Sequence, residues 1–144
     1  MLVHIPDIDS AFRECACILR PRGKMLLYTT METELLEPLE AERLYKPLAI
    51  RPVRRPELEQ SFAAAGFRIA QVHEIGSEMM EAYEELDRRA SLRLMRIARM
   101  RRLKSELIGR WGTERFDTIL ALYHWMIYLL LGKLTAAYYI LEKE

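Results

Sequence analysis

The stretch DIDSAFRECACILRPRGKMLLYTT, residues 7–30, contains a helix pattern, a turn and a strand pattern in immediate succession. Apolar residues recur at spacings of three and four over residues 7–19, which predicts an amphipathic helix with Asp7 as its N-cap. Proline and glycine at residues 20–23 end that helix. The apolar run at residues 24–30 is too short for a helix and predicts a buried strand.

The same alternation of helix and strand continues along the chain. A helix pattern begins at Pro56 and stops at Gly66, and residues 67–73 then alternate like a half-buried strand near a sheet edge. Residues 116–131 form an apolar helix pattern, and residues 134–141 are apolar on both faces, like an interior strand. Strands alternating with helices predict an α/β fold with a three-stranded sheet.

Two longer helical stretches interrupt this order. Residues 31–44 are rich in glutamate and predict a helix interrupted at Pro38, followed by a loop that contains Pro47. Residues 77–108 carry a long helical pattern in about two pieces, with a break near Gly112.

The composition is that of a soluble globular protein of single-domain length, 144 residues. Lys plus Arg (22) nearly balances Asp plus Glu (21), so we expect no nucleic-acid partner. The N-terminus has no secretory signal pattern, and the apolar stretch 118–141 is split by Gly132 and Lys133, so we expect a cytoplasmic protein without a transmembrane span. Two cysteines cannot form a disulfide framework or a four-thiolate zinc site.

Two segments resemble one known family. His4-Ile5-Pro6-Asp7 followed by Ile18-Leu19-Arg20-Pro21-Arg22-Gly23-Lys24, and Pro56-Glu57-Leu58 through Ala64-Ala65-Gly66-Phe67, are similar to class I S-adenosylmethionine-dependent methyltransferases of the small-molecule type. The first segment resembles the family's approach to its fifth strand and the second its approach to the sixth, and residues 132–143 are placed like the seventh. The resemblance implies part of a Rossmann-like methyltransferase sheet, with three strands of which the last is antiparallel, and helical insertions.

The resemblance also implies a domain organisation. The chain would be one domain, 1–144, equivalent to the C-terminal half of the methyltransferase fold. Its core would comprise residues 1–30, 52–75 and 132–143, and its helical, substrate-facing insertions would comprise residues 31–51 and 76–131.

The family's cofactor is S-adenosyl-L-methionine, held by a Gly-rich turn after the first strand and an acidic residue after the second. Both features would lie upstream of Met1, and no two of the six glycines form a G-x-G after a strand. The resemblance therefore implies a small-molecule methyltransferase fragment that lacks its cofactor-binding half and is inactive alone, with no cofactor-binding residue in this chain.

A strand at residues 24–30 without the family's fourth strand beside it would have a free apolar edge, and such an edge pairs readily with another chain. We therefore expect self-association, or a partner chain, at this edge. A non-catalytic interaction module, or a subunit of a split enzyme, is the main alternative function.

His4 lies at the rim where the family's cofactor and substrate meet, so it is the candidate catalytic residue, either orienting a substrate or accepting a proton; an exposed turn residue is the equal alternative. Candidate substrate-binding residues are those at the carboxyl end of the first strand and in an aromatic-rich helix, where core packing is the alternative role. They are Tyr28, Thr30, Tyr123, His124 and Tyr128. We expect a small-molecule methyl acceptor and no metal.

Residues 88–104 contain eight basic and no acidic side chains. This helix pattern could bind an anionic lipid surface or nucleic acid, but a solvated face paired with the preceding Glu-rich segment is the favoured interpretation. A peripheral anionic-surface binder is therefore the third function considered.

Overall fold

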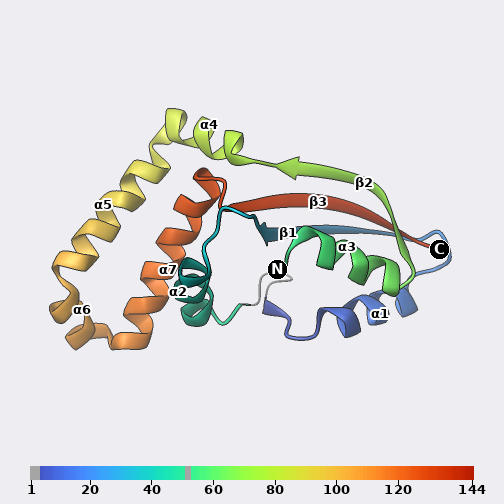
Figure 1. Cartoon of the computed structure of the whole chain (residues 1–144), viewed down its shortest axis with the longest axis horizontal. Helices are drawn as coiled ribbons and strands as arrows, with labels where there is room; N and C mark the ends of the chain where they lie inside the picture. Colours follow the sequence, from blue (N-terminus) through green and yellow to red (C-terminus); the bar gives the residue numbers. More distant parts are fainter. Residues whose placement is uncertain (1–3, 51–52) are drawn as a thin grey trace. The chain divides into compact units, whose positions relative to one another are not determined.

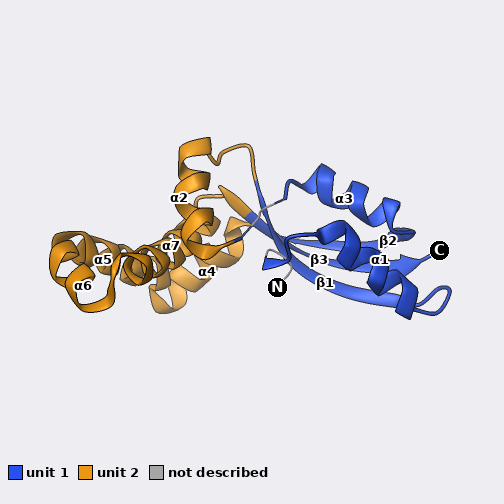
Figure 2. Ribbon diagram, turned by 90° about the horizontal axis from the view of Figure 1, so that it is seen from below, with its two compact units in different colours: residues 1–32, 50–75, 135–144 blue, residues 33–49, 76–134 orange. Residues whose placement is uncertain are grey.

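The computed structural model describes residues 4–50 and 53–144, which divide into two compact units (Figures 1 and 2). Unit 1 comprises residues 1–32, 50–75 and 135–144, and unit 2 comprises residues 33–49 and 76–134. The elements are α1 (Ile8–Ile18), β1 (Lys24–Glu32), α2 (Pro38–Leu48), α3 (Arg55–Ala64), β2 (Phe67–Ile75), α4 (Ser77–Asp87), α5 (Arg89–Arg102), α6 (Lys104–Trp111), α7 (Thr113–Leu130) and β3 (Leu134–Lys143).

The described residues form one three-stranded sheet in the order β1-β3-β2. β3 pairs with β2 in an antiparallel register that runs from Phe67 opposite Lys143 to Ile75 opposite Ala136. The backbone of Lys143 at the end of β3 also exchanges hydrogen bonds with Arg22 and Gly23 just before β1, so β3 is antiparallel to β1 as well. The predicted α/β sheet of three strands with an antiparallel last strand is confirmed, and the apolar residues of 134–141 form its central strand.

Helices α1 and α3 cover one face of this sheet side by side (Figure 1). The predicted N-cap of α1 is confirmed, because an Asp7 carboxylate oxygen accepts the backbone N–H of Ser10 at 2.9 Å. α3 ends where Gly66 takes φ +80°, a conformation that favours glycine. The buried core of unit 1 comprises Phe12, Ala16, Leu27, Met31, Leu58, Phe62, Phe67, Ala137, Tyr139 and Leu141.

One face of β1 is buried along most of the strand, whereas the other face is exposed over its first half and buried at Thr30. Leu27 and Met31 lie in the core, whereas Leu26 is 69% exposed and Tyr28 is 38% exposed. The expectation of a buried strand is therefore wrong for the face that carries Leu26 and Tyr28, because α1 and α3 pack on the face that carries Leu27 and Met31. β1 is also an edge strand, as the sheet order shows.

Unit 2 is built around α7, with α2 and α5 packed against it. The Thr118 hydroxyl near the start of α7 donates to the Pro47 carbonyl near the end of α2 at 3.1 Å. Glu40 near the start of α2 is bonded to Lys133, just after α7. The two helices are therefore antiparallel.

Two helix boundaries in unit 2 differ from the sequence-based expectation. Pro38 begins α2 instead of interrupting a helix, because the missing N–H of proline costs nothing in a first turn. Pro47 lies inside the last turn of α2, not in a loop, and its neighbour in the expected loop, Pro52, lies outside the described residues.

The long helical stretch forms three helices, not two. Arg88 adopts φ 54° between α4 and α5, and the Glu84 carboxylate accepts the backbone N–H groups of Ala90 and Ser91 at the start of α5. A second break lies at Leu103, and the predicted break at Gly112 separates α6 from α7. None of the helices in the described ranges has the length and apolarity needed to cross a membrane.

Candidate functional site

The carboxyl end of β1 contains two of the predicted substrate-binding residues. Thr30 is buried, at 3% exposure. Tyr28 lies on the uncovered face, where its ring centroid is 4.9 Å from that of Tyr138 on the neighbouring strand. The structure therefore buries Thr30, whereas Tyr28 belongs to an exposed aromatic pair.

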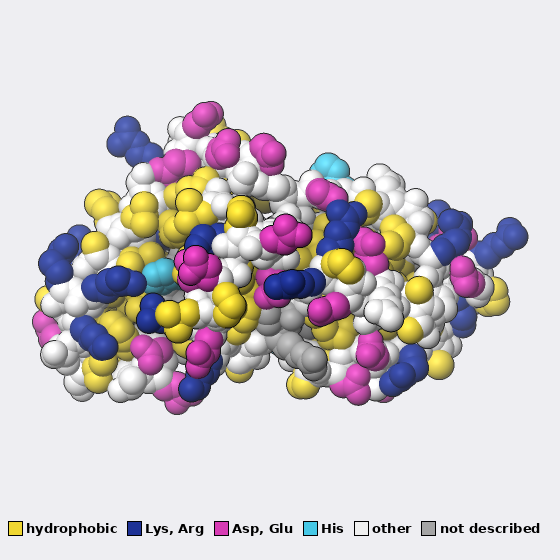
Figure 3. All heavy atoms as spheres, viewed as in Figure 1, with side chains coloured by type: hydrophobic (Ala, Val, Ile, Leu, Met, Phe, Trp, Pro, Cys, Tyr) yellow, Lys and Arg dark blue, Asp and Glu magenta, His cyan; other side chains and the backbone are white. Residues whose placement is uncertain are grey.

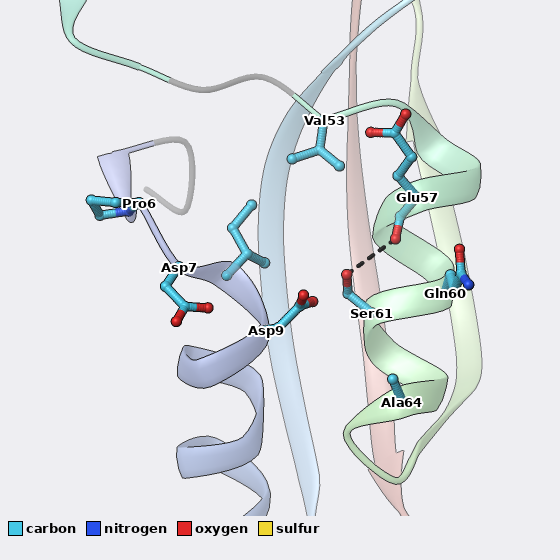
Figure 4. A pocket seen from close by; sticks show the side chains of 9 residues that line it. Pro6, Asp7, Asp9, Val53, Glu57, Gln60, Ser61 and Ala64 are labelled. Carbon is cyan, nitrogen blue, oxygen red and sulfur yellow. Dashed lines mark hydrogen bonds between the residues drawn. The ribbon is translucent and has the colours of Figure 1, made fainter.

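A cavity of about 500 Å³ lies in unit 1 between the start of α1 and α3 (Figure 4). Its walls carry Asp9 and Glu57, whereas the Ser61 hydroxyl is occupied by a hydrogen bond to the Glu57 carbonyl at 3.1 Å. Hydrogen bonds from the Ser10 backbone and side chain lower the pKa of Asp7, which therefore serves α1 as its cap. His4, the candidate catalytic residue, is exposed and does not line this cavity.

A buried tyrosine lies beneath α3. Tyr139 is completely buried, and its hydroxyl is 3.3 Å from a Glu59 carboxylate oxygen. Burial raises the pKa of Tyr139 to about 12, and the nearby Glu59 charge adds to the rise. The Arg55 guanidinium binds Glu59 at 2.7 Å and also binds Glu74. This network holds α3 on the sheet and keeps Tyr139 protonated at neutral pH.

The second cavity, of about 660 Å³, lies in unit 2 along the groove between α2 and α7. His124 and Tyr128 line it from α7, one helical turn apart, together with Leu120 and Ala121. The structure thus brings together two of the residues that the sequence analysis selected. Both are partly buried, so one side of each ring remains available to a ligand.

Tyr123 does not share this cavity. A helix turns by about 100° per residue, so adjacent positions face different directions. Tyr123 packs instead with the cluster of Met100, Leu107 and Phe116, and the Arg96 guanidinium lies 5.7 Å from its ring centroid. His124 and Tyr128 of the aromatic segment therefore line the cavity, whereas Tyr123 packs among the helices of unit 2.

Glu40, which lines the α2–α7 cavity, forms an ion pair with Lys133. The Lys133 ammonium group donates to both carboxylate oxygens of Glu40 at 2.5 Å. The hydrogen bond from Lys133 lowers the pKa of Glu40, and the same bond raises the pKa of Lys133. The Lys133 ammonium nitrogen also lies 5.5 Å from the ring centroid of Tyr128.

The turn after α7 explains how Lys133 reaches this place. Gly132 adopts φ 68°, and the backbone N–H groups of Gly132 and Lys133 return to the carbonyls of Leu129 and Tyr128. This double hydrogen bond is a Schellman motif, which ends α7 and turns the chain back. The Thr33 hydroxyl donates to the Gly132 carbonyl at 2.7 Å and holds the turn in place.

The sequence analysis missed the charged residues Glu40, Arg43 and Arg101 of this cavity, and Lys133, which binds Glu40. A glycine directly after a long apolar helix is the signal for the turn that places Lys133. The pairing of α2 with α7 is a tertiary event, and no local pattern indicated it. Within residues 4–50 and 53–144, no three His, Cys, Asp or Glu side chains are grouped so that they could hold a metal ion.

Comparisons with known proteins identify the fold. No family model matches the sequence, and no curated protein matches it. Among solved structures, a protein described as a sarcosine dimethylglycine methyltransferase from Galdieria sulphuraria matches 99% of this chain with a TM-score of 0.64 and 18% identity. The mycolic acid cyclopropane synthase CmaA1, solved with SAH and CTAB, matches 98% with a TM-score of 0.62 and 17% identity.

The chain has the fold of about half of a class I S-adenosylmethionine-dependent methyltransferase. It spans 50% of the Galdieria protein and 52% of the cyclopropane synthase. A cyclase, SpnF, matches equally well, with a TM-score of 0.64 over 99% of this chain and 47% of its own length at 19% identity. The resemblance stated from the sequence is confirmed at the level of the fold, and the fold also supports a reaction other than methyl transfer.

Proposed function

We propose that this chain supplies the C-terminal half of a cytoplasmic methyltransferase that transfers a methyl group from S-adenosylmethionine to a small molecule. The observation that carries the proposal is the match to methyltransferase structures over 98% and 99% of the chain. That match includes a sheet of the expected order, with its antiparallel strand in the centre.

The residues of this chain do not fit the cofactor by themselves. The glycines lie at 23, 66, 76, 109, 112 and 132, so no G-x-G turn is present to approach a nucleotide. We therefore assign no cofactor-binding residue and derive no transfer step here. The contribution of this half is to bind and orient the acceptor, which in such a reaction accounts for much of the rate.

The acceptor would occupy the α2–α7 cavity, where His124 and Tyr128 form part of one wall. His4 remains the proposed proton acceptor for a hydroxyl or amine substrate, and its side chain is exposed. Tyr28 and Thr30 in β1 remain proposed substrate-binding residues of the complete enzyme.

Cofactor binding tests the proposal directly. Isothermal titration of the chain alone should show no saturable binding of S-adenosylmethionine up to ~1 mM. Ultraviolet crosslinking of tritiated cofactor to a complex purified through a tag on this chain should label the partner polypeptide and not this one. Micromolar binding by the chain alone would contradict the assignment of the cofactor site to another half.

The partner in that experiment would bind at β1. β1 is an edge strand on which Leu26 and Tyr28 are exposed, and an additional strand could pair along the part of this edge before Glu32, which forms an isolated parallel bridge with Arg54. A complex that forms through this edge but neither labels with cofactor nor methylates a small molecule would instead favour the non-catalytic interaction module.

A second candidate function is supported by α5. Leu92, Met95 and Leu103 are 41%, 58% and 41% exposed, and Arg99 and Arg102 lie between them on the outer side of the helix. Mixed basic and apolar exposure of this kind suits the surface of an anionic membrane. Co-sedimentation with phosphatidylserine vesicles, lost in Arg99→Glu/Arg102→Glu and at high salt, would support it; equal binding to neutral phosphatidylcholine vesicles would oppose it.

A further inference from the structure

The α2–α7 cavity contains two guanidinium groups that come from different helices. Arg43 lies on α2 and Arg101 lies at the end of α5, and both line the cavity. Among the residues that the structure describes, no carboxylate forms an ion pair with either of them. Two exposed cationic side chains that meet at a cavity without a protein counter-ion point to an anionic ligand.

The two guanidinium groups act on the same side chain. Burial raises the pKa of Tyr128 and the charge of Glu40 adds to the rise, whereas the charges of Lys133, Arg43 and Arg101 oppose it. Arg43 and Arg101 are therefore both within electrostatic reach of the Tyr128 hydroxyl. The Tyr128 hydroxyl is itself hydrogen-bonded to Glu40, so the donors that Arg43 and Arg101 contribute to the cavity wall are their guanidinium groups.

Within the described residues, the acidic side chains of the cavity form no ion pair with Arg43 or Arg101, and a third cation, Lys46, also lines the cavity. Glu40 is bonded to Lys133, as described above. Glu42 and Asp117 also line the cavity, but neither forms an ion pair with Arg43 or Arg101 in the described ranges. Figure 3 shows basic, acidic and apolar side chains interleaved over the face of unit 2 that it presents.

The remaining walls are apolar or amphipathic. Leu44 and Ala121 belong to the buried core of this part of unit 2, and Leu120 lies beside them in the cavity. The Nδ1 atom of His124 is 2.8 Å from the Leu120 carbonyl oxygen, which can only accept, so Nδ1 carries the proton. His124 therefore keeps its Nε2 atom for another partner.

We propose that the α2–α7 cavity binds a small organic anion, with its carboxylate or phosphate between Arg43 and Arg101 and its apolar part against Leu44, Leu120 and Ala121. A guanidinium fork matches the paired oxygens of either anion, and the volume suits a small molecule. The identification of this anion as the methyl acceptor rests on the proposed function. The binding of the anion to this chain is independent of that function.

Isothermal titration of the whole chain with hexyl phosphate, hexanoate, inorganic phosphate and hexanol tests the inference. We expect saturable binding of at least one of the two amphiphilic anions, and the comparison of the two identifies the head group. Inorganic phosphate and hexanol should each bind at least ~10-fold more weakly than the better amphiphilic anion. Inorganic phosphate lacks the apolar part, and hexanol lacks the charged head group. Binding of hexanol or of inorganic phosphate with the same affinity as the amphiphilic anion would overturn the proposal.

Substitutions locate the site. Arg43→Ala and Arg101→Ala should each weaken binding of the amphiphilic anion by ~10-fold or more, and Arg43→Lys should lose part of the affinity while keeping the charge. Arg115→Ala, at an exposed position of α7 that does not line the cavity, is the matched control and should bind like the wild type. Unchanged binding in both cavity variants, or an equal loss in the control, would overturn the assignment.

The same experiments separate this inference from the proposed function. Arginine-dependent anion binding by a chain that supports no methyl transfer with any partner would retain the anion site and remove the methyltransferase proposal. Methyl transfer that is unaffected by Arg43→Ala and Arg101→Ala, in a chain that binds no anion, would retain the methyltransferase proposal and remove the anion site.

Discussion

Unit 1 and unit 2 are stabilised in different ways, although the chain passes repeatedly from one to the other. Unit 1 packs two helices on one face of a sheet and leaves Leu26, Tyr28 and Tyr138 exposed on the other face. Unit 2 packs α2 and α5 against α7 and retains a cavity with charged walls. The sheet unit thus has an unsatisfied surface suited to a macromolecular partner, and the helical unit has a concave site suited to a small molecule.

The largest effect is expected in the core of unit 1. Phe62 is completely buried and makes edge-to-face ring contacts with Phe12 at 4.9 Å and Tyr139 at 5.1 Å. Phe62→Ala should lower the free energy of unfolding by about 3–5 kcal/mol, measured by far-ultraviolet circular dichroism in urea. A loss below ~1 kcal/mol would show that this cluster does not support the sheet unit.

A matched substitution in unit 2 sharpens the comparison. Phe116 is 2% exposed in a core of its own, so Phe116→Ala should cost about as much. Both tryptophans, Trp111 and Trp125, lie in unit 2, and their emission therefore reports the unfolding of that unit. We expect Phe116→Ala to shift the emission transition more than Phe62→Ala; identical shifts would mean that the units unfold as one.

The next effect concerns the free edge of unit 1. Leu26→Lys/Tyr28→Lys should weaken self-association at β1 by about 100-fold, or about 2.7 kcal/mol, because charged side chains disfavour pairing of edge strands. Sedimentation equilibrium over a concentration series measures the change. Leu122→Lys, at a 53% exposed position of α7, is the control and should associate like the wild type. A wild-type chain that stays monomeric throughout would contradict the prediction.

Two glycines provide the same local test in both units. Gly66 in unit 1 and Gly132 in unit 2 have φ of 80° and 68°, so Gly66→Ala and Gly132→Ala should each cost about 1–2 kcal/mol. Gly109 lies within α6 with open space around it, and Gly109→Ala should stabilise the chain by about 0.5–1 kcal/mol. Urea unfolding of the three variants measures the pattern, and a destabilising Gly109→Ala would contradict it.

The smallest effect should be that of the ion pair in unit 2. The pKa of Glu40 is lowered in the folded chain, mainly by Lys133, so its ionised form stabilises the fold above the ordinary glutamate pKa. This contribution should be lost as the pH falls through the lowered pKa of Glu40. Lys133→Met should remove that part of the pH dependence, whereas Lys104→Met should leave it intact; urea unfolding at several pH values below 5 would distinguish them.

Local patterns predicted most of unit 1 and less of unit 2. The Asp7 cap, the stop at Gly66 and the central position of residues 134–141 follow from short-range chemistry, and all are found in the structure. The start of α2 at Pro38 was missed because a proline can either break a helix or begin one, and only the surrounding packing decides which.

For the candidate site, the sequence identified ring side chains but not their charged surroundings. His124 and Tyr128 were selected because aromatic residues cluster in that segment, and Tyr123 was selected with them although it faces another helix. Arg43, Arg101 and Lys133 are distant in sequence from one another, and nothing local distinguishes them from other basic residues.

The sequence by itself determined the order of helices and strands, the turns at Gly66 and Gly132, and the resemblance to methyltransferases, because backbone conformation and hydrophobic periodicity act over a few residues. Only the tertiary structure decided that one face of β1 stays exposed and that α2 and α7 enclose a cavity with Arg43 and Arg101 at its wall. Packing of segments far apart in the chain brings such charges together, and no local pattern encodes it.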